Sequence, residues 1–288
     1  MKNQNFGIEI EFTGITRKAA AETLSTYFGT TFTATRDSYD TYKIPDSEGR
    51  NWKIVRDASI RIEGGEQCEL VSPICRYTDI ETIQELVRKL RTAGGKANTS
   101  CGIHVHVDAA PHTAKSIRNI ANIMTAKEDL IFKALQVDEG RARRYCKKVE
   151  DSFIEKINRK KPQTLAAVKN LWYNGQDGSW QHYHDSRYHA LNLHSVFQKG
   201  TIEFRMFNST LSHAGKVKAY IQFCLAISHQ ALTQASASKR KTTTTNDKYT
   251  FRTWLLRLGL IGDEFKTARL HLLSCLEGDS AWRQAQAA

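Results

Sequence analysis

The sequence GIEIEF occupies residues 7–12 and shows the alternation that decides the fold. The two isoleucines and Phe12 take one face of an extended chain, while Glu9 and Glu11 take the other, because side chains two residues apart share a face. Two neighbouring carboxylates repel each other, so a dry site at this position would need a cation beside them. The stretch therefore predicts a half-buried strand with a polar, cation-binding face.

Other segments of the chain repeat this pattern. The stretch GIHVHV places His104 and His106 on one face, and TIEFRM places Glu203 and Arg205 on one face. Further polar residues on predicted strands or at their ends are Lys53, Asp57, Glu69 and Asn192. If these strands form one sheet, its polar face is lined by metal ligands and anion-binding groups. Oxygen ligands predominate, which favours Mg²⁺ or Mn²⁺ over zinc.

Each of these patterns has a simpler explanation when it is taken alone. A Glu-x-Glu pair on an amphipathic strand usually faces solvent, and a His-x-His pair is more often structural than metal-binding. Glu203 and Arg205 could form a cross-strand ion pair that contributes little to stability. The metal hypothesis therefore depends on the joint pattern, because all of these polar residues face away from strongly apolar strand faces.

The order of predicted elements favours an α+β fold built on an antiparallel sheet. A helix is expected over residues 18–28 with Thr16 as its N-cap, and a second helix is expected after Asp79. Strands at 31–35 and 52–55 are separated by a predicted loop. We expect a catalytic domain over 1–235 with a basic helical insertion at about 139–165, a flexible linker over 236–249 and a small helical C-terminal cap over 250–288.

Composition places the chain among ordinary globular proteins. Its 288 residues carry a formal net charge of +12 and are 40% hydrophobic. No apolar run approaches the roughly 20 residues that a membrane span requires, so no membrane partner is expected. The first residues lack the pattern of a signal peptide. The six cysteines show no Cys-x-x-Cys spacing, which favours reduced thiols and a cytoplasmic location.

Six ordered motifs carry a resemblance to a known family. They are GIEIEF at 7–12, WKIVRDASI at 52–60, ELVSPI at 69–74, CGIHVHVD at 101–108, RYHALN at 187–192 and GTIEFR at 200–205. Together they resemble the putative amidoligase family, a group of carboxylate–amine ligases within the glutamine synthetase and glutamate–cysteine ligase superfamily. The resemblance implies a curved antiparallel sheet of the glutamine synthetase-like type with flanking helices, whose concave face holds ATP and divalent ions.

The same resemblance implies a set of metal ligands and phosphate-binding groups. One ion would be held by Glu11, Asp57 and Glu69, and another by Glu9, Glu203 and one imidazole. His104 is favoured for that imidazole over His106, although a shared strand face does not separate them. Catalytic roles fall to Arg205, Arg187 and Glu203, with both arginines on the transferring phosphate or the acyl phosphate. Nucleotide-binding roles fall to Lys53, Arg187, Asn192 and Arg205.

The implied reaction is ATP-dependent amide formation through an acyl phosphate, with help from Mg²⁺ or Mn²⁺. Its partners would be a nucleotide, a carboxylate and an amine, and an acidic peptide or protein is one candidate substrate. A first alternative is a metal-dependent hydrolase that uses His104 and His106, which would need a parallel barrel. A second is a basic nucleic-acid-binding protein, suggested by the net charge and by the aromatic loop around Trp180. Nucleic acid is not favoured, because buried carboxylates repel phosphates.

Overall fold

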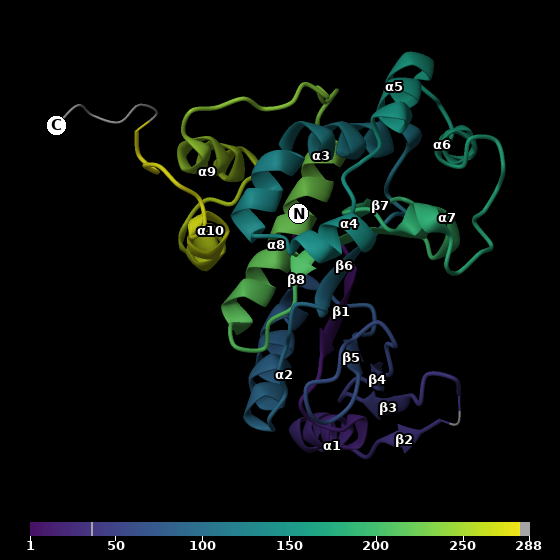
Figure 1. Cartoon of the computed structure of the whole chain (residues 1–288), viewed down its shortest axis with the longest axis vertical. Coiled ribbons are helices and arrows are strands. Elements are labelled where there is room, and N and C mark those ends of the chain that lie inside the picture. The colour runs from purple at the N-terminus through teal and green to yellow at the C-terminus, as the bar shows by residue number, and fades with distance from the viewer. Residues whose placement is uncertain (36, 283–288) are drawn as a thin grey trace. The chain divides into compact units, whose positions relative to one another are not determined.

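Alternating apolar residues form strands in the computed structural model, which describes residues 1–35 and 37–282 (Figure 1). The chain divides into two compact units. The N-terminal unit comprises Lys2–His106 and Phe207–Ile221. The C-terminal unit comprises Met1, Val107–Met206 and the residues from Gln222 onward. Residues 1–235, the predicted catalytic domain, contribute to both units.

The N-terminal unit contains most of the strands and two long helices. Its elements are β1 (Phe6–Phe12), α1 (Arg17–Phe28), β2 (Thr33–Ala34), β3 (Tyr42–Pro45), β4 (Asn51–Val55), β5 (Cys68–Val71), the 3₁₀ helix η1 (Tyr77–Asp79) and α2 (Ile80–Thr92). Three further elements contribute residues to both units, namely β6 (Gly102–Asp108), β8 (Thr201–Asn208) and α8 (Ala214–Thr233).

The C-terminal unit is mainly helical. Its elements are α3 (Ala114–Leu135), α4 (Glu139–Arg144), α5 (Asp151–Lys160), α6 (Leu165–Trp172), η2 (Asp185–Arg187), β7 (Leu191–Asn192), α7 (His194–Gln198), α9 (Asp247–Arg257), η3 (Asp263–Phe265) and α10 (Lys266–Leu273). Helix α9 begins inside the predicted linker, and residues 283–288 of the predicted cap lie outside the described part of the chain. None of the helices in the described ranges combines the length and apolar character needed to span a bilayer.

The eight strands of the described residues form one sheet in the order β2-β3-β4-β5-β1-β6-β8-β7. The pairings of β2 with β3, β3 with β4, β4 with β5, β5 with β1 and β7 with β8 are antiparallel. This confirms the prediction of a mixed helix and strand fold built on an antiparallel sheet. The open sheet differs from the parallel barrel that the hydrolase alternative requires.

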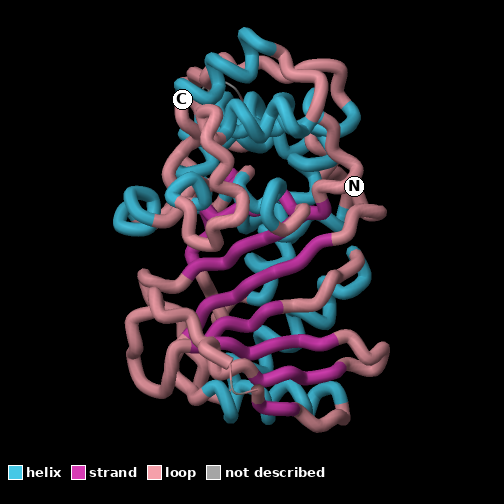
Figure 2. The backbone as a smooth tube through the Cα atoms, turned by 90° about the vertical axis from the view of Figure 1, so that its right-hand side faces the viewer, coloured by secondary structure: helices cyan, strands magenta, loops and turns pink. Residues whose placement is uncertain are grey.

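One face of the sheet in the N-terminal unit is apolar and buried. Ile54, Leu70 and Ile10 lie opposite one another across β4, β5 and β1, and all three are fully buried. Helix α1 packs against β3, β4 and α2. Figure 2 shows the strands of this unit side by side. Because this face is filled by apolar packing, the polar residues of the same strands are directed to the other face.

Helix α1 begins and ends close to the residues that its sequence predicts. The Thr16 side chain accepts a hydrogen bond from the backbone nitrogen of Ala19 at 3.1 Å, as expected of an N-cap. Gly29 ends the helix in the left-handed region at φ 66°, which costs a glycine little because it has no Cβ. The predicted helix and its cap are therefore confirmed.

The sequence prediction of a loop between residues 35 and 52 is wrong for residues 42–45 and agrees with the turn at 46–50. Strand β3 forms there and pairs with β4 through a short turn. The Asp46 carboxylate closes this turn by accepting hydrogen bonds from the backbone nitrogens of Glu48 and Arg50, at 3.0 and 2.9 Å. Pro45, a residue type typical of loops, stands at the last residue of β3.

Candidate active site

Two rows of side chains cross β4, β5 and β1 on the polar face of the sheet. The rows are Lys53–Val71–Glu9 and Val55–Glu69–Glu11. Residues directly opposite one another in an antiparallel pair share a face and lie close together. Glu9, Glu11 and Glu69 are therefore neighbours on one face, although about sixty residues separate Glu69 from the other two.

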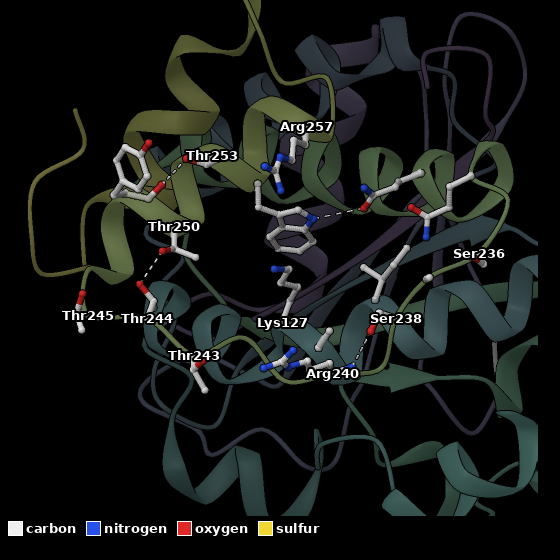
Figure 3. Close-up of a pocket in the computed structure, with 17 residues that line it drawn as sticks. Lys127, Ser236, Ser238, Arg240, Thr243, Thr244, Thr245, Thr250, Thr253 and Arg257 are labelled. Atoms are coloured by element: carbon white, nitrogen blue, oxygen red, sulfur yellow. Dashed lines mark hydrogen bonds between the residues drawn. The ribbon is translucent and has the colours of Figure 1, made fainter. Parts of the chain in front are cut away.

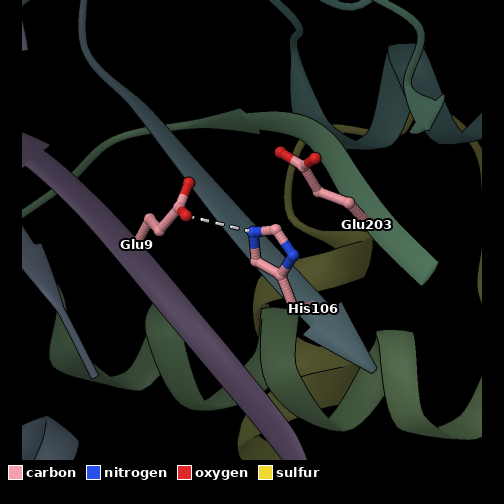
Figure 4. Close-up of side chains that lie close together, drawn as sticks. All are labelled: Glu9, His106 and Glu203. Carbon is pink, nitrogen blue, oxygen red and sulfur yellow. Dashed lines mark ion pairs between the residues drawn. The ribbon is translucent and has the colours of Figure 1, made fainter. Parts of the chain in front are cut away.

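Two imidazoles from β6 contact these carboxylates. The Nδ1 atom of His104 lies 3.0 Å from Oε2 of Glu9, and its Nε2 atom lies 3.7 Å from Oε1 of Glu11. The Nε2 atom of His106 lies 3.3 Å from Oε1 of Glu9, and Figure 4 shows these two side chains pointing toward one another from β6 and β1. Both imidazoles are buried, so their contacts with carboxylates are shielded from water.

Within the N-terminal unit, two groups of described residues could each hold a cation. The first is Glu11, Asp57 and Glu69, and the second is Glu9, Glu69 and His104. Within each group, one ligand atom from every residue lies within 4.8 Å of the others. Three of the four carboxylates lie on paired strands, and their mutual repulsion is relieved by a cation. The donor set of oxygens with one imidazole fits Mg²⁺ or Mn²⁺.

The backbone holds Glu11 in place. Its Oε2 atom accepts a hydrogen bond from the backbone nitrogen of Gly102 at 2.5 Å, and the residue is buried. Glu9 and Glu69 are half-buried, and Asp57 follows the end of β4. A carboxylate that is held by a backbone donor loses little conformational freedom when it binds a ligand. The Gly102 hydrogen bond therefore positions Glu11 before any ion binds.

Lys53 occupies the row that contains Glu9, but its side chain is exposed whereas Glu9 is half-buried. It lies opposite Val71 and is exposed on β4. Its ammonium group can reach a charged ligand at the edge of the polar face without being desolvated. The predicted role of Lys53 in binding a phosphate is compatible with this position and stays a prediction.

The C-terminal unit contains a second polar cluster around Glu203. Asn192 lies opposite Glu203 in the pairing of β7 with β8 and donates to its Oε2 atom at 2.5 Å. Arg205 donates from Nη1 to Oε1 of Glu203 at 2.5 Å and from Nε to the backbone oxygen of Tyr145 at 3.2 Å. All three side chains are buried. Charge-assisted hydrogen bonds of this kind fix both partners in one arrangement.

Arg187 occupies a different setting. It belongs to η2, donates from Nη1 to the backbone oxygen of His182 at 3.0 Å, and places its guanidinium 5.3 and 5.7 Å from the ring centres of Tyr183 and Tyr188. Within the described ranges it makes no hydrogen bond to Glu203, Arg205 or Asn192. Glu203 and Glu9 belong to different units, and the prediction that they share one ion stays a prediction.

Two functional candidates were not predicted from the sequence. Arg141, which lies in the predicted basic insertion, is buried and donates from Nη2 to the backbone oxygen of Arg205 at 3.1 Å. His194 stands two residues after Asn192, begins α7 and contacts the Tyr173 hydroxyl through Nδ1 at 2.5 Å. No local spacing marks either contact, because both partners come from distant segments.

Comparison with known proteins identifies a family for this chain. A family model described as "Putative amidoligase enzyme" matches residues 2–228. A search of curated proteins gave no match. The matched region includes every residue of the two cation-binding groups and of the Glu203 cluster.

Proposed function

This chain belongs to the amidoligase family, and we propose that it joins a carboxylate to an amine at the expense of ATP through an acyl-phosphate intermediate. The family supports an enzyme that forms amide bonds. The dependence on ATP, the intermediate and the residue roles given below are our proposal. The observation that carries it is the sharing of Glu69 by two cation-binding groups on one polar sheet face.

The first step would activate the carboxylate. A carboxylate oxygen attacks the γ-phosphorus of ATP, the bond to the bridging oxygen breaks, and ADP leaves. Bound Mg²⁺ or Mn²⁺, held by Glu11, Asp57 and Glu69 and by Glu9, Glu69 and His104, would supply charge neutralisation for the phosphates. Lys53, exposed in the row of Glu9, would bind a phosphate oxygen.

The second step would form the amide. The amine nitrogen attacks the carbonyl carbon of the acyl phosphate, inorganic phosphate leaves, and the nitrogen loses a proton. Carboxylates of the polar face can bind the incoming ammonium and accept this proton.

The residues around Glu203 would stabilise the phosphoryl group during its transfer. Arg205 is held by Glu203 and by the oxygen of Tyr145, so its guanidinium is positioned before substrate arrives. We propose that Arg205 and Arg187 stabilise the phosphate, that Glu203 is a further metal ligand, and that Asn192 orients Glu203. The resemblance of the motifs supports these roles, and the burial of Glu203, Arg205 and Asn192 is compatible with them.

An isotope experiment tests the reaction. The purified protein is incubated with ATP, Mg²⁺ or Mn²⁺, and libraries of amines and of carboxylates labelled with ¹⁸O. We expect a product whose mass equals the sum of acid and amine minus water, with one ¹⁸O atom recovered in inorganic phosphate. The label reaches phosphate only if the carboxylate oxygen has attacked phosphorus.

The test variant is Glu69→Gln, which removes the shared metal ligand and should abolish both amide product and ¹⁸O labelling of phosphate. Glu85→Gln, a change on the exposed side of α2, should have no effect. Amide formation without ¹⁸O transfer would exclude the acyl phosphate. ATP hydrolysis that is equal with and without divalent ions would overturn the metal-dependent proposal.

A further inference from the structure

A second candidate binding site lies in the C-terminal unit, in a cavity of about 900 Å³ between α3, α8, α9 and the segment 236–246 (Figure 3). A volume of this size accommodates a nucleotide-sized molecule. Most of the lining comes from residues after 228, the last residue of the family match. The cavity is therefore formed largely by a part of the chain that the family model does not cover.

The lining is strongly cationic. It includes Lys127, Arg240 and Arg257, and no carboxylate is among the lining residues in the described part of the chain. Within the same ranges, neither the Arg240 nor the Arg257 guanidinium has an ion-pair partner. Three like charges around one cavity repel, so a bound anion lowers the free energy of this arrangement.

Lys127 is half-buried and its ammonium group is affected by the charge of Arg257. Its Nζ atom lies 5.7 Å from the ring centre of Trp254 and donates to Oγ1 of Thr242 at 2.8 Å. Burial and the nearby charge of Arg257 lower its pKa. An anion in the cavity would oppose both effects by pairing with the ammonium group.

Hydroxyl groups and fixed backbone complete the wall. The cavity is also lined by Ser236, Ser238, Thr243, Thr244, Thr250 and Thr253. The segment that carries Arg240 is attached to α3, because Asn122 donates to the oxygen of Ala237 at 3.0 Å and the nitrogen of Thr242 donates to the oxygen of Ala126 at 3.0 Å. The wall is therefore formed before any ligand binds, which reduces the entropy cost of binding.

We propose that this cavity binds a small molecule bearing two or more phosphate groups. Three cations match the charge of a diphosphate, and the hydroxyl groups supply neutral donors to its oxygens. The concave shape and the limited volume favour a small molecule over a nucleic-acid strand, which needs an extended groove. The site is independent of the proposed ligase site, since it shares none of its residues.

Calorimetric titration of the full chain tests the proposal, with EDTA present so that no divalent ion contributes. The probes are pyrophosphate, ADP and a single-stranded oligonucleotide. We expect pyrophosphate to bind to the wild type, to bind more weakly as salt rises, and to lose at least about tenfold in affinity in Arg240→Gln and in Arg257→Gln. Both arginines are exposed, so neither change should unfold the protein.

Arg252→Gln is the matched control, because Arg252 lies on α9 but outside the cavity lining. It should leave pyrophosphate binding unchanged. If ADP binds more tightly than pyrophosphate and its binding depends on Arg257, the ligand is a nucleotide. If ADP and pyrophosphate bind with equal affinity, the site recognises the phosphate groups alone. The absence of binding to the wild type, or equal losses in Arg252→Gln, would overturn the proposal.

Binding of the oligonucleotide alone, in an Arg257-dependent manner, would replace the proposal with a nucleic-acid site. Two variants distinguish failure of this proposal from failure of the proposed ligase function. Arg257→Gln should retain amide formation, and Glu69→Gln should retain pyrophosphate binding without metal.

Discussion

Glu69 lies directly opposite Glu11 in the antiparallel pairing of β5 with β1. Like charges in that position destabilise a sheet, because the two side chains are held close together on the same face. The protein keeps this unfavourable pair on a half-buried face beside two imidazoles. A divalent cation between the carboxylates converts the repulsion into binding energy, which makes the pair a sensitive test of the metal hypothesis.

Glu69→Gln should therefore have opposite effects on the metal-free and the metal-bound protein. Without metal, loss of one charge should raise the free energy of unfolding by up to about 1 kcal/mol. With millimolar Mn²⁺, the wild type should gain several degrees in melting temperature and the variant little. Thermal melts with and without Mn²⁺ measure both effects, and Glu85→Gln is the control. A variant that is stabilised by Mn²⁺ as strongly as the wild type would contradict shared ligation.

The two imidazoles should contribute unequally to metal binding. His104 contacts both Glu9 and Glu11 and belongs to a cation-binding group with Glu9 and Glu69, whereas His106 contacts Glu9. His104→Ala should weaken Mn²⁺ affinity about 10- to 100-fold, as expected for loss of a ligand. His106→Ala should weaken it less. Calorimetry with Mn²⁺ on the two variants makes the comparison, and the reverse order would assign the ligand to His106.

Glu203→Gln should remove turnover and also reduce stability. The change leaves the Arg205 guanidinium buried without its carboxylate, although the hydrogen bond to the oxygen of Tyr145 remains. Breaking a buried pair in this way costs about 3 kcal/mol. Urea unfolding gives the stability, and amide formation at low temperature gives the activity. Retained turnover in a destabilised variant would make Glu203 a structural residue only.

Glu128 should make the fold less stable as pH rises. It is buried in α3, where both carboxylate oxygens lie within hydrogen-bond distance of the nitrogen of Val149, and burial raises its pKa to about 7. The folded protein therefore favours the protonated form. This contribution to stability is fully present below pH 4.5, its ordinary pKa, and is lost as pH rises through about 7.

Glu128→Gln keeps the acceptor and removes the titration. The variant should match the wild type near pH 5 and exceed it at pH 8 by up to about 3 kcal/mol, since each pKa unit corresponds to about 1.4 kcal/mol. Urea unfolding at the two pH values measures this difference. The exposed Glu139→Gln should show no such dependence. A constant difference between wild type and Glu128→Gln at both pH values would rule out the buried, protonated carboxyl.

The sequence by itself determined which residues share a strand face and where some helices begin. Alternation in β1 and β6 separates Glu9, Glu11 and the two histidines from apolar neighbours, because the side-chain period of a strand is two. Thr16 marks the start of α1 through a local hydrogen bond. Such features depend only on residues a few positions apart.

Only the tertiary structure decided which of these residues meet. Glu69 joins Glu11 because β5 pairs with β1 in one register, and a shift of one residue would turn its side chain to the apolar face. The burial of Glu128 and Arg141 also depends on distant segments that pack over them. Register and burial arise from pairing across long stretches of chain, and neither spacing nor composition records them.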